Sequence, residues 1–66
     1  MDKTQRDLVS RLFTLATEVL ENAHEPMTQG QSVRLSAAEY RNRAVLLEQV
    51  AQDLNSVARA IAATLR

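Results

Sequence analysis

Residues 36–65 read SAAEYRNRAVLLEQVAQDLNSVARAIAATL and contain two rows of apolar residues, one of alanines and one of bulky branched side chains. In both rows the residues recur every seven positions, a spacing that keeps side chains on one side of an α-helix. The segment therefore predicts one long helix with two apolar stripes. They are formed by Ala37, Ala44, Ala51 and Ala58, and by Leu47, Leu54 and Ile61 with Val50 and Val57 between them.

The start of this helix is indicated by Ser36 and Glu39. A serine hydroxyl and a glutamate carboxylate three residues apart form a capping box, which satisfies two backbone N–H groups that lack helical partners. No glycine or proline follows in the sequence. We therefore expect a helix over residues 36–65.

A second amphipathic segment precedes it. Leucine, valine and phenylalanine recur at helical spacing through residues 8–20, and Asp2 or Thr4 can cap the start. Pro26 disfavours helical geometry at the residue before it. We expect a first helix over residues 2–24 and a connection over residues 25–35.

These two helices predict an all-α fold, a single antiparallel two-helix hairpin that spans residues 1–66. The apolar arc on each helix is about 160–180° wide, whereas one neighbouring helix hides only roughly 100°. A chain of 66 residues has a thin core, and without cysteine it has no disulfide to support it. We therefore expect the hairpin to complete its core by dimerisation into a four-helix bundle or by binding a partner protein.

The composition argues against several other classes of function. Eight basic and eight acidic residues cancel, so no net charge attracts nucleic acid or a membrane surface. Gly30 stands alone, and His24 is the single histidine, so neither a phosphate-binding loop nor a metal site is indicated. We expect no enzymatic activity, no catalytic, cofactor-binding or metal-binding residue, and no small-molecule ligand.

The location follows from what the sequence lacks. No apolar run approaches the roughly 20 residues that span a bilayer. The first seven residues carry charges of both signs and no apolar stretch follows them directly, unlike a secretory signal. We expect a cytoplasmic protein.

The two stripes of the second helix are expected to have different roles. Small side chains allow two helix backbones to approach closely, so we expect the alanine row to pack against the other helix of the chain. The bulky row would then face a partner, although both rows are equally periodic and the reverse assignment stays open. The expected protein-binding residues are Leu46, Val50, Leu54, Val57, Ile61 and Leu65, with Phe13 and Tyr40 as further candidates.

Residues 35–61 also resemble the second helix of the small two-helix chaperones of type III secretion. The resemblance rests on an early aromatic residue, a Leu–Glu pair and β-branched residues at heptad spacing, here Tyr40, Leu47–Glu48, Val50, Val57 and Ile61. It implies a hairpin that pairs with a helical-repeat co-chaperone. Together the two would hold an aggregation-prone needle subunit in the cytoplasm.

The function we expect is non-enzymatic protein binding, as a small chaperone, adaptor or inhibitor that packs a helix face into a groove. The alternative is a homodimeric four-helix bundle that binds RNA or a regulatory protein through its polar faces. Arg41 and Arg59 share one polar side of the second helix with Glu48, so that side is mixed in charge and not basic. This mixture favours the first hypothesis.

Overall fold

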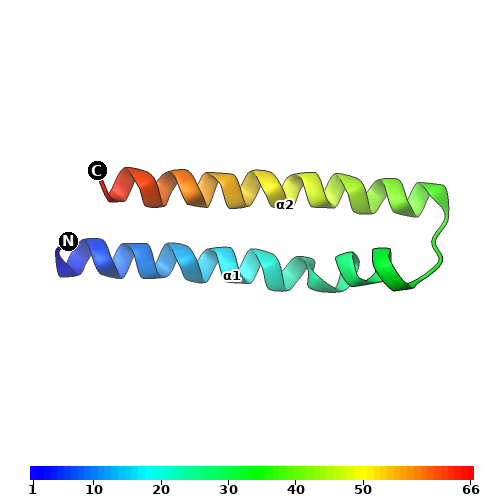
Figure 1. Ribbon diagram of the computed structural model, residues 1–66, viewed down its shortest axis with the longest axis horizontal. Helices are drawn as coiled ribbons and strands as arrows, with labels where there is room; N and C mark the ends of the chain where they lie inside the picture. The colour runs from blue at the N-terminus through cyan, green and yellow to red at the C-terminus, as the bar shows by residue number, and fades with distance from the viewer.

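The computed structural model describes residues 1–66 as two antiparallel helices, α1 (Lys3–Ser32) and α2 (Ala37–Thr64). The helices lie side by side along their whole length, and both termini are at the same end (Figure 1). The Cα atoms extend over 50 × 15 × 11 Å. The molecule is therefore a single layer, and the predicted all-α hairpin is confirmed.

Capping boxes begin both helices. Asp2 Oδ1 accepts a hydrogen bond from the Gln5 N–H at 2.7 Å, and the Gln5 side chain accepts one from the Asp2 N–H at 3.1 Å. Ser36 and Glu39 form the same reciprocal pair, with both distances at 3.2 Å. The cap predicted at Ser36 is thus present, and α2 begins at the next residue.

The expected end of the first helix at His24 is wrong. The helix continues through Pro26 to Ser32, so the connection comprises residues 33–36 and not 25–35. Proline removes one backbone N–H and crowds the carbonyl four residues before it. Pro26 is nevertheless half-buried, and α2 extends alongside this end of α1. Packing against α2 therefore outweighs the local preference of proline.

Bulky side chains of α2 form the contact between the helices. Val50 and Val57 are buried, as is Ala23 of α1, and no other residue of the chain is buried. Half-buried residues complete the interface, namely Val9, Leu12, Ala16 and Val19 of α1 and Leu46, Leu54 and Ile61 of α2.

The expected roles of the two stripes are therefore reversed within the chain. Every member of the alanine row is exposed, so Ala37, Ala44, Ala51 and Ala58 do not form the close helix contact. Val50 and Val57, which we expected to face a partner, hold the hairpin together. Hydrophobic stabilisation grows with buried apolar area, so packing valine and leucine inward stabilises the hairpin more than packing methyl groups.

Polar contacts define the alignment of the helices at both ends of the hairpin. Near the termini, Gln5 Nε2 donates to the carbonyl oxygen of Thr64 at 3.1 Å. Near the connection, Arg43 Nη2 donates to Gln29 Oε1 at 3.0 Å. The Arg43 Nε is buried without a partner. Because unpaired buried donors are costly, sliding one helix along the other would be disfavoured if it also broke the hydrogen bond between Arg43 and Gln29.

The continuous α1 helix predicts that Pro26→Ala stabilises the protein. Alanine restores the missing N–H donor, and a proline in a helix interior costs about 3 kcal/mol relative to alanine. We expect the free energy of unfolding to rise by about 1–3 kcal/mol in urea titrations followed by circular dichroism.

Gly30→Ala tests the same segment independently. A Cβ at Gly30 meets no atom within 4 Å, so we expect a gain of about 0.5–1 kcal/mol from the helix propensity of alanine. If neither variant gained stability, α1 would not be helical beyond Pro26.

The capping box predicts that Ser36→Ala lowers the free energy of unfolding by about 1 kcal/mol. Ser56→Ala is the matched control, because Ser56 lies on the exposed side of α2 and its hydroxyl donates only to the Gln52 carbonyl oxygen, four residues earlier in the same helix. Equal losses in the two variants would contradict a specific role for the cap.

The same cap predicts a pH dependence. The hydrogen bond from the Ser36 N–H, followed by the contribution of its hydroxyl, lowers the pKa of Glu39 below its ordinary value of 4.5. The ionised carboxylate therefore stabilises the fold above this value, and the contribution disappears as the pH falls through the lowered pKa. We expect wild type to be more stable than Glu39→Gln at neutral pH and to lose this advantage in acid, as measured by thermal unfolding.

The helix interface predicts that Val57→Ala costs about 2 kcal/mol, because two buried methyl groups are lost. Val45→Ala makes the same chemical change at a side chain that is 64% exposed, and we expect it to alter stability by less than about 0.5 kcal/mol. Similar losses at both positions, measured by urea unfolding, would rule out the observed packing of α2.

Candidate protein-binding surface

One face of the hairpin carries two parallel rows of apolar residues. On α1, Phe13, Leu20 and Met27 are seven residues apart, and each comes one residue after a half-buried residue, namely Leu12, Val19 and Pro26. On α2, a second row has the same spacing and consists of Ala44, Ala51, Ala58 and Leu65. Each of its members comes one residue after a buried or half-buried residue, namely Arg43, Val50, Val57 and Thr64. In an antiparallel pair, equivalent flanking positions of the two helices lie on the same side.

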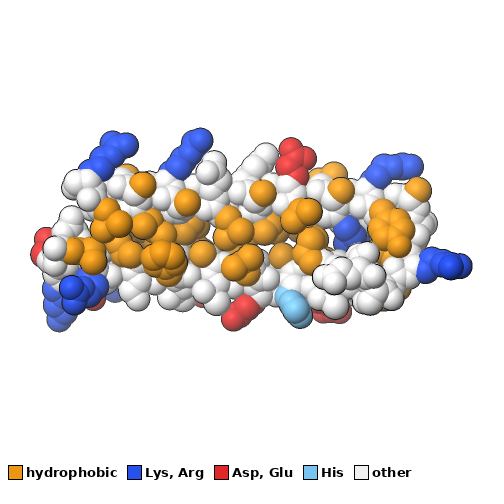
Figure 2. Space-filling model, in the orientation of Figure 1, with side chains coloured by type: hydrophobic (Ala, Val, Ile, Leu, Met, Phe, Trp, Pro, Cys, Tyr) orange, Lys and Arg blue, Asp and Glu red, His pale blue; other side chains and the backbone are white.

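A shallow groove between the helices shows that the two rows share one face. It is lined by eight residues, of which seven are hydrophobic: Leu20, Ala23, His24, Met27, Leu47, Val50, Ala51 and Leu54. On this side hydrophobic side chains follow most of the seam between the two helices, and the last turns of α1 carry polar side chains instead (Figure 2). We call this surface the apolar face, formed by Phe13, Leu20, Met27, Tyr40, Ala44, Leu47, Ala51, Ala58 and Leu65.

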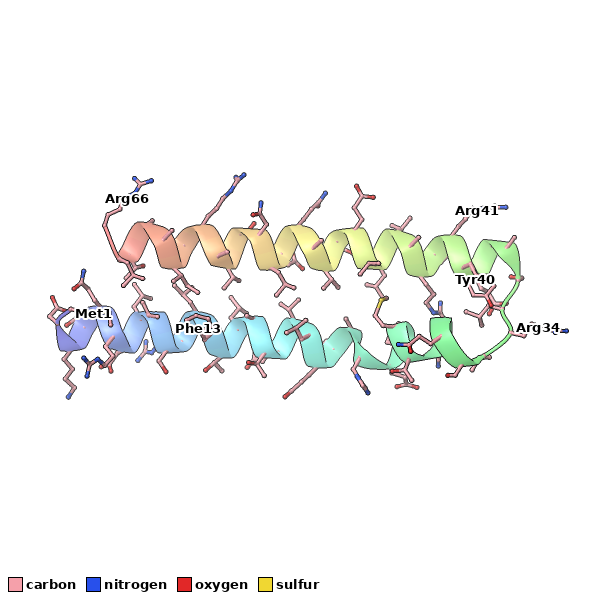
Figure 3. The ribbon with its side chains drawn as sticks, viewed as in Figure 1. Met1, Phe13, Arg34, Tyr40, Arg41 and Arg66 are labelled. Atoms are coloured by element: carbon pink, nitrogen blue, oxygen red, sulfur yellow. The ribbon has the colours of Figure 1, made fainter.

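The largest side chains of the apolar face are exposed. Phe13, Leu20 and Leu47 are 58%, 54% and 54% exposed, respectively. Phe13 and Tyr40 lie towards opposite ends of the hairpin (Figure 3). These side chains have no partner within the chain large enough to cover them, so the apolar face is incompletely packed.

Tyr40 also contacts the connection between the helices. Its hydroxyl donates to the Val33 carbonyl oxygen and accepts from the Leu35 N–H, each at 3.4 Å. The ring is therefore held in place over the apolar face while remaining 44% exposed. A side chain that is ordered before binding loses little conformational entropy when a partner covers it.

The apolar face has an uneven profile. Large side chains project from the α1 row, whereas the α2 row consists mainly of alanine methyl groups. A partner helix could therefore approach the backbone of α2 more closely than that of α1. The alanine stripe is exposed and does not form the contact with α1.

The opposite face is more polar. Its groove is lined by Val19, Ala23, Leu46 and Val50 together with Asn22, Gln49 and Asp53. Leu8 and Leu15 are exposed and belong to the other flank of α1, but Asn22 and Gln29 continue that row at the same spacing. The longest uninterrupted apolar surface is therefore the apolar face.

The structure places the predicted binding residues in three different environments. Phe13, Tyr40 and Leu65 are exposed on the apolar face, and their role in binding stays a prediction. Leu54 and Ile61 are half-buried, and Leu46 lines the groove of the opposite face. Val50 and Val57 are buried, so most of their surface is already covered by α1.

Six residues of the apolar face were absent from the expected binding set. Three are the alanines Ala44, Ala51 and Ala58, which we expected to pack against the other helix of the chain, and the others are Leu20, Met27 and Leu47. The seven-residue spacing from Phe13 indicates Leu20 and Met27, but the assumed helix end at His24 placed Met27 in a turn. Leu47 belongs to the bulky row that was expected to face a partner, but it was not among the expected binding residues.

The ionisable side chains do not form a metal-binding cluster. No three histidine, cysteine, aspartate or glutamate side chains are close enough together to hold a metal ion. His24 is exposed at the edge of the apolar groove. Neither α1 nor α2 has a stretch with the length and hydropathy required to cross a membrane.

Comparison with known proteins adds no further information on this surface. No protein-family model, curated protein or solved structure matches the chain.

Proposed function

We propose that the chain is a non-enzymatic protein-binding hairpin whose apolar face packs against a helical partner. The exposure of Phe13, Leu20 and Leu47 on a single face is the observation that carries this proposal. A continuous exposed apolar surface on a small protein is characteristic of an interaction site. The partner would place an apolar helix face along the groove between α1 and α2.

The energetics favour a partner that covers the whole face. Complete burial of a leucine or phenylalanine side chain contributes about 1.5–3 kcal/mol. Phe13, Leu20 and Leu47 have about half of this contribution left to gain, because they are already partly covered. A micromolar complex requires about 8 kcal/mol. Three side chains are therefore too few, and the neighbouring alanines, Met27 and Tyr40 must take part.

Within this proposal the chain acts as a small chaperone, adaptor or inhibitor. The resemblance to two-helix chaperones of type III secretion supports the chaperone version, in which the partner is a helical-repeat co-chaperone and the location is cytoplasmic. Two of the residues behind that resemblance, Tyr40 and Leu47, belong to the apolar face. Val50, Val57 and Ile61 contribute instead to the contact between α1 and α2, and Glu48 is exposed.

The polar surfaces give less support to RNA binding. A nucleic-acid site requires a basic patch that contacts several phosphates. Arg41 and Arg59 are exposed on α2, but the exposed carboxylate of Glu48 lies between them along the helix. We therefore assign binding to the apolar face and not to the polar ones.

Site-specific photo-cross-linking tests the proposal. A benzoylphenylalanine in place of Phe13 reports on the apolar face, and one in place of the exposed Val45 reports on the outer surface of α2. In cells of the native host we expect the probe at Phe13 to give a defined protein adduct, identified by mass spectrometry, which the probe at Val45 does not give. Identical adduct patterns, or no adduct at Phe13, would contradict binding through this face.

A further inference from the structure

We propose that a second copy of this chain covers the apolar face, so that α1 of each copy lies on α2 of the other. The proposal rests on the proposed function, because it assumes that the apolar face binds protein. The two copies are related by a twofold axis parallel to the helices. All four helices then enclose one core, and the connections of both copies lie at the same end.

The alignment of the two rows is the first argument. The Gln5–Thr64 and Gln29–Arg43 hydrogen bonds link α1 and α2 at both ends of the hairpin, and the levels of the residues between them lie between the two alignments that these links set. In this alignment Leu20 is level with Ala51, and both line the same groove. The seven-residue spacing then places Phe13 level with Ala58 and Met27 level with Ala44.

A twofold rotation about an axis parallel to the helices places α1 of one copy opposite α2 of the other. It leaves every residue at the same level along the axis. Each member of the α1 row therefore meets an alanine of the other copy: Phe13 meets Ala58, Leu20 meets Ala51, and Met27 meets Ala44. Large residues opposite small ones allow facing layers to interdigitate without voids. The surface is thus complementary to itself in this arrangement.

The perpendicular twofold axis gives a poorer fit. It stacks α1 on α1 and α2 on α2, with their ends reversed. Phe13 and Leu20 would then face the same large row of the other copy, while alanines would face alanines. Close packing of the alanine rows would force the large rows together, and close packing of the large rows would leave a gap between the alanines.

The polar residues at the edge of the face fit the same arrangement. His24, Thr17 and Gln31 follow the α1 row on its outer side, and Glu48, Asn55 and Arg41 follow the α2 row. Between the two copies, His24 comes level with Glu48, Thr17 with Asn55 and Gln31 with Arg41. None of these pairs joins like charges, so the rim of the interface is electrostatically compatible.

The face also has the dimensions of a stable interface. The face viewed in Figure 1 measures 50 × 15 Å between Cα atoms, a projected area of about 750 Å² per copy. A standard stable interface buries roughly 800 Å² per partner. The net charge of zero opposes association only weakly. A second copy would therefore compete with any other partner for the same face.

Sedimentation equilibrium on the purified chain tests the proposal, with circular dichroism to verify that each variant is helical. We expect wild type to be a dimer, and Leu20→Ala and Ala51→Leu each to weaken dimerisation at least tenfold. Leu20→Ala removes the large side chain that lies opposite Ala51 of the other copy. Ala51→Leu places a second large side chain opposite Leu20 of the other copy. Val45→Ala and Ala38→Leu make matched changes at exposed positions outside the apolar face, and we expect both to remain dimeric.

An equimolar mixture of Leu20→Ala and Ala51→Leu then tests the arrangement itself. In the mixed dimer every contact at this level again joins one large and one small side chain, so we expect the dimer to be restored. Failure of the mixture to associate would overturn the proposed arrangement. A folding defect within one chain cannot explain restoration of the dimer in the mixture, because each chain still carries its own substitution.

A wild-type chain that stays monomeric at millimolar concentration would overturn the proposal. The protein-binding function would still stand if benzoylphenylalanine at Phe13 formed an adduct with a different protein. Conversely, an adduct at Phe13 between two copies of the chain, together with restoration in the mixture, would support both.

Discussion

Packing of the α2 valines against α1 is the contact on which the rest of the structure depends. Two helices in a single layer can enclose only a narrow strip of side chains, and here only Val50, Val57 and Ala23 are buried. All other apolar residues lie at the edges of this strip or outside it. The incomplete core and the exposed apolar face thus have the same geometric cause, because two cylinders touch along one line.

The alignment of the helices gives this exposed surface its pattern. Hydrogen bonds from Gln5 and Arg43 link α1 and α2 near the two ends of the hairpin. They place a row of large residues beside a row of alanines at matching levels. A shift of one helical turn would preserve the amphipathic character of both helices but would change which large residue is level with which alanine. Polar contacts at the ends of the hairpin therefore help to determine which large residue lies beside which alanine in the middle of the apolar face.

Local signals in the sequence were sufficient to predict a helix end where no tertiary contact opposed them. The capping box at Ser36 and Glu39 predicts the start of α2, because its hydrogen bonds involve only residues three apart. At Pro26 the local signal was misleading. A proline in a helix interior costs about 3 kcal/mol, yet α1 continues alongside α2 to Ser32, and sequence periodicity does not show which of the two effects is larger.

The assignment of the binding residues had the same limitation. Heptad spacing shows that the alanine and bulky rows of α2 each lie on one side of the helix, but it does not show which row faces α1. The number of apolar stripes, their spacing and the excess of apolar surface were determined by the sequence alone, since they follow from the repeat of the α-helix. Only the tertiary structure decided that Val50 and Val57 turn inward and that Ala51 lies beside Leu20 on the open face. That choice depends on the area that both helices bury together, which is a property of the pair and not of either segment.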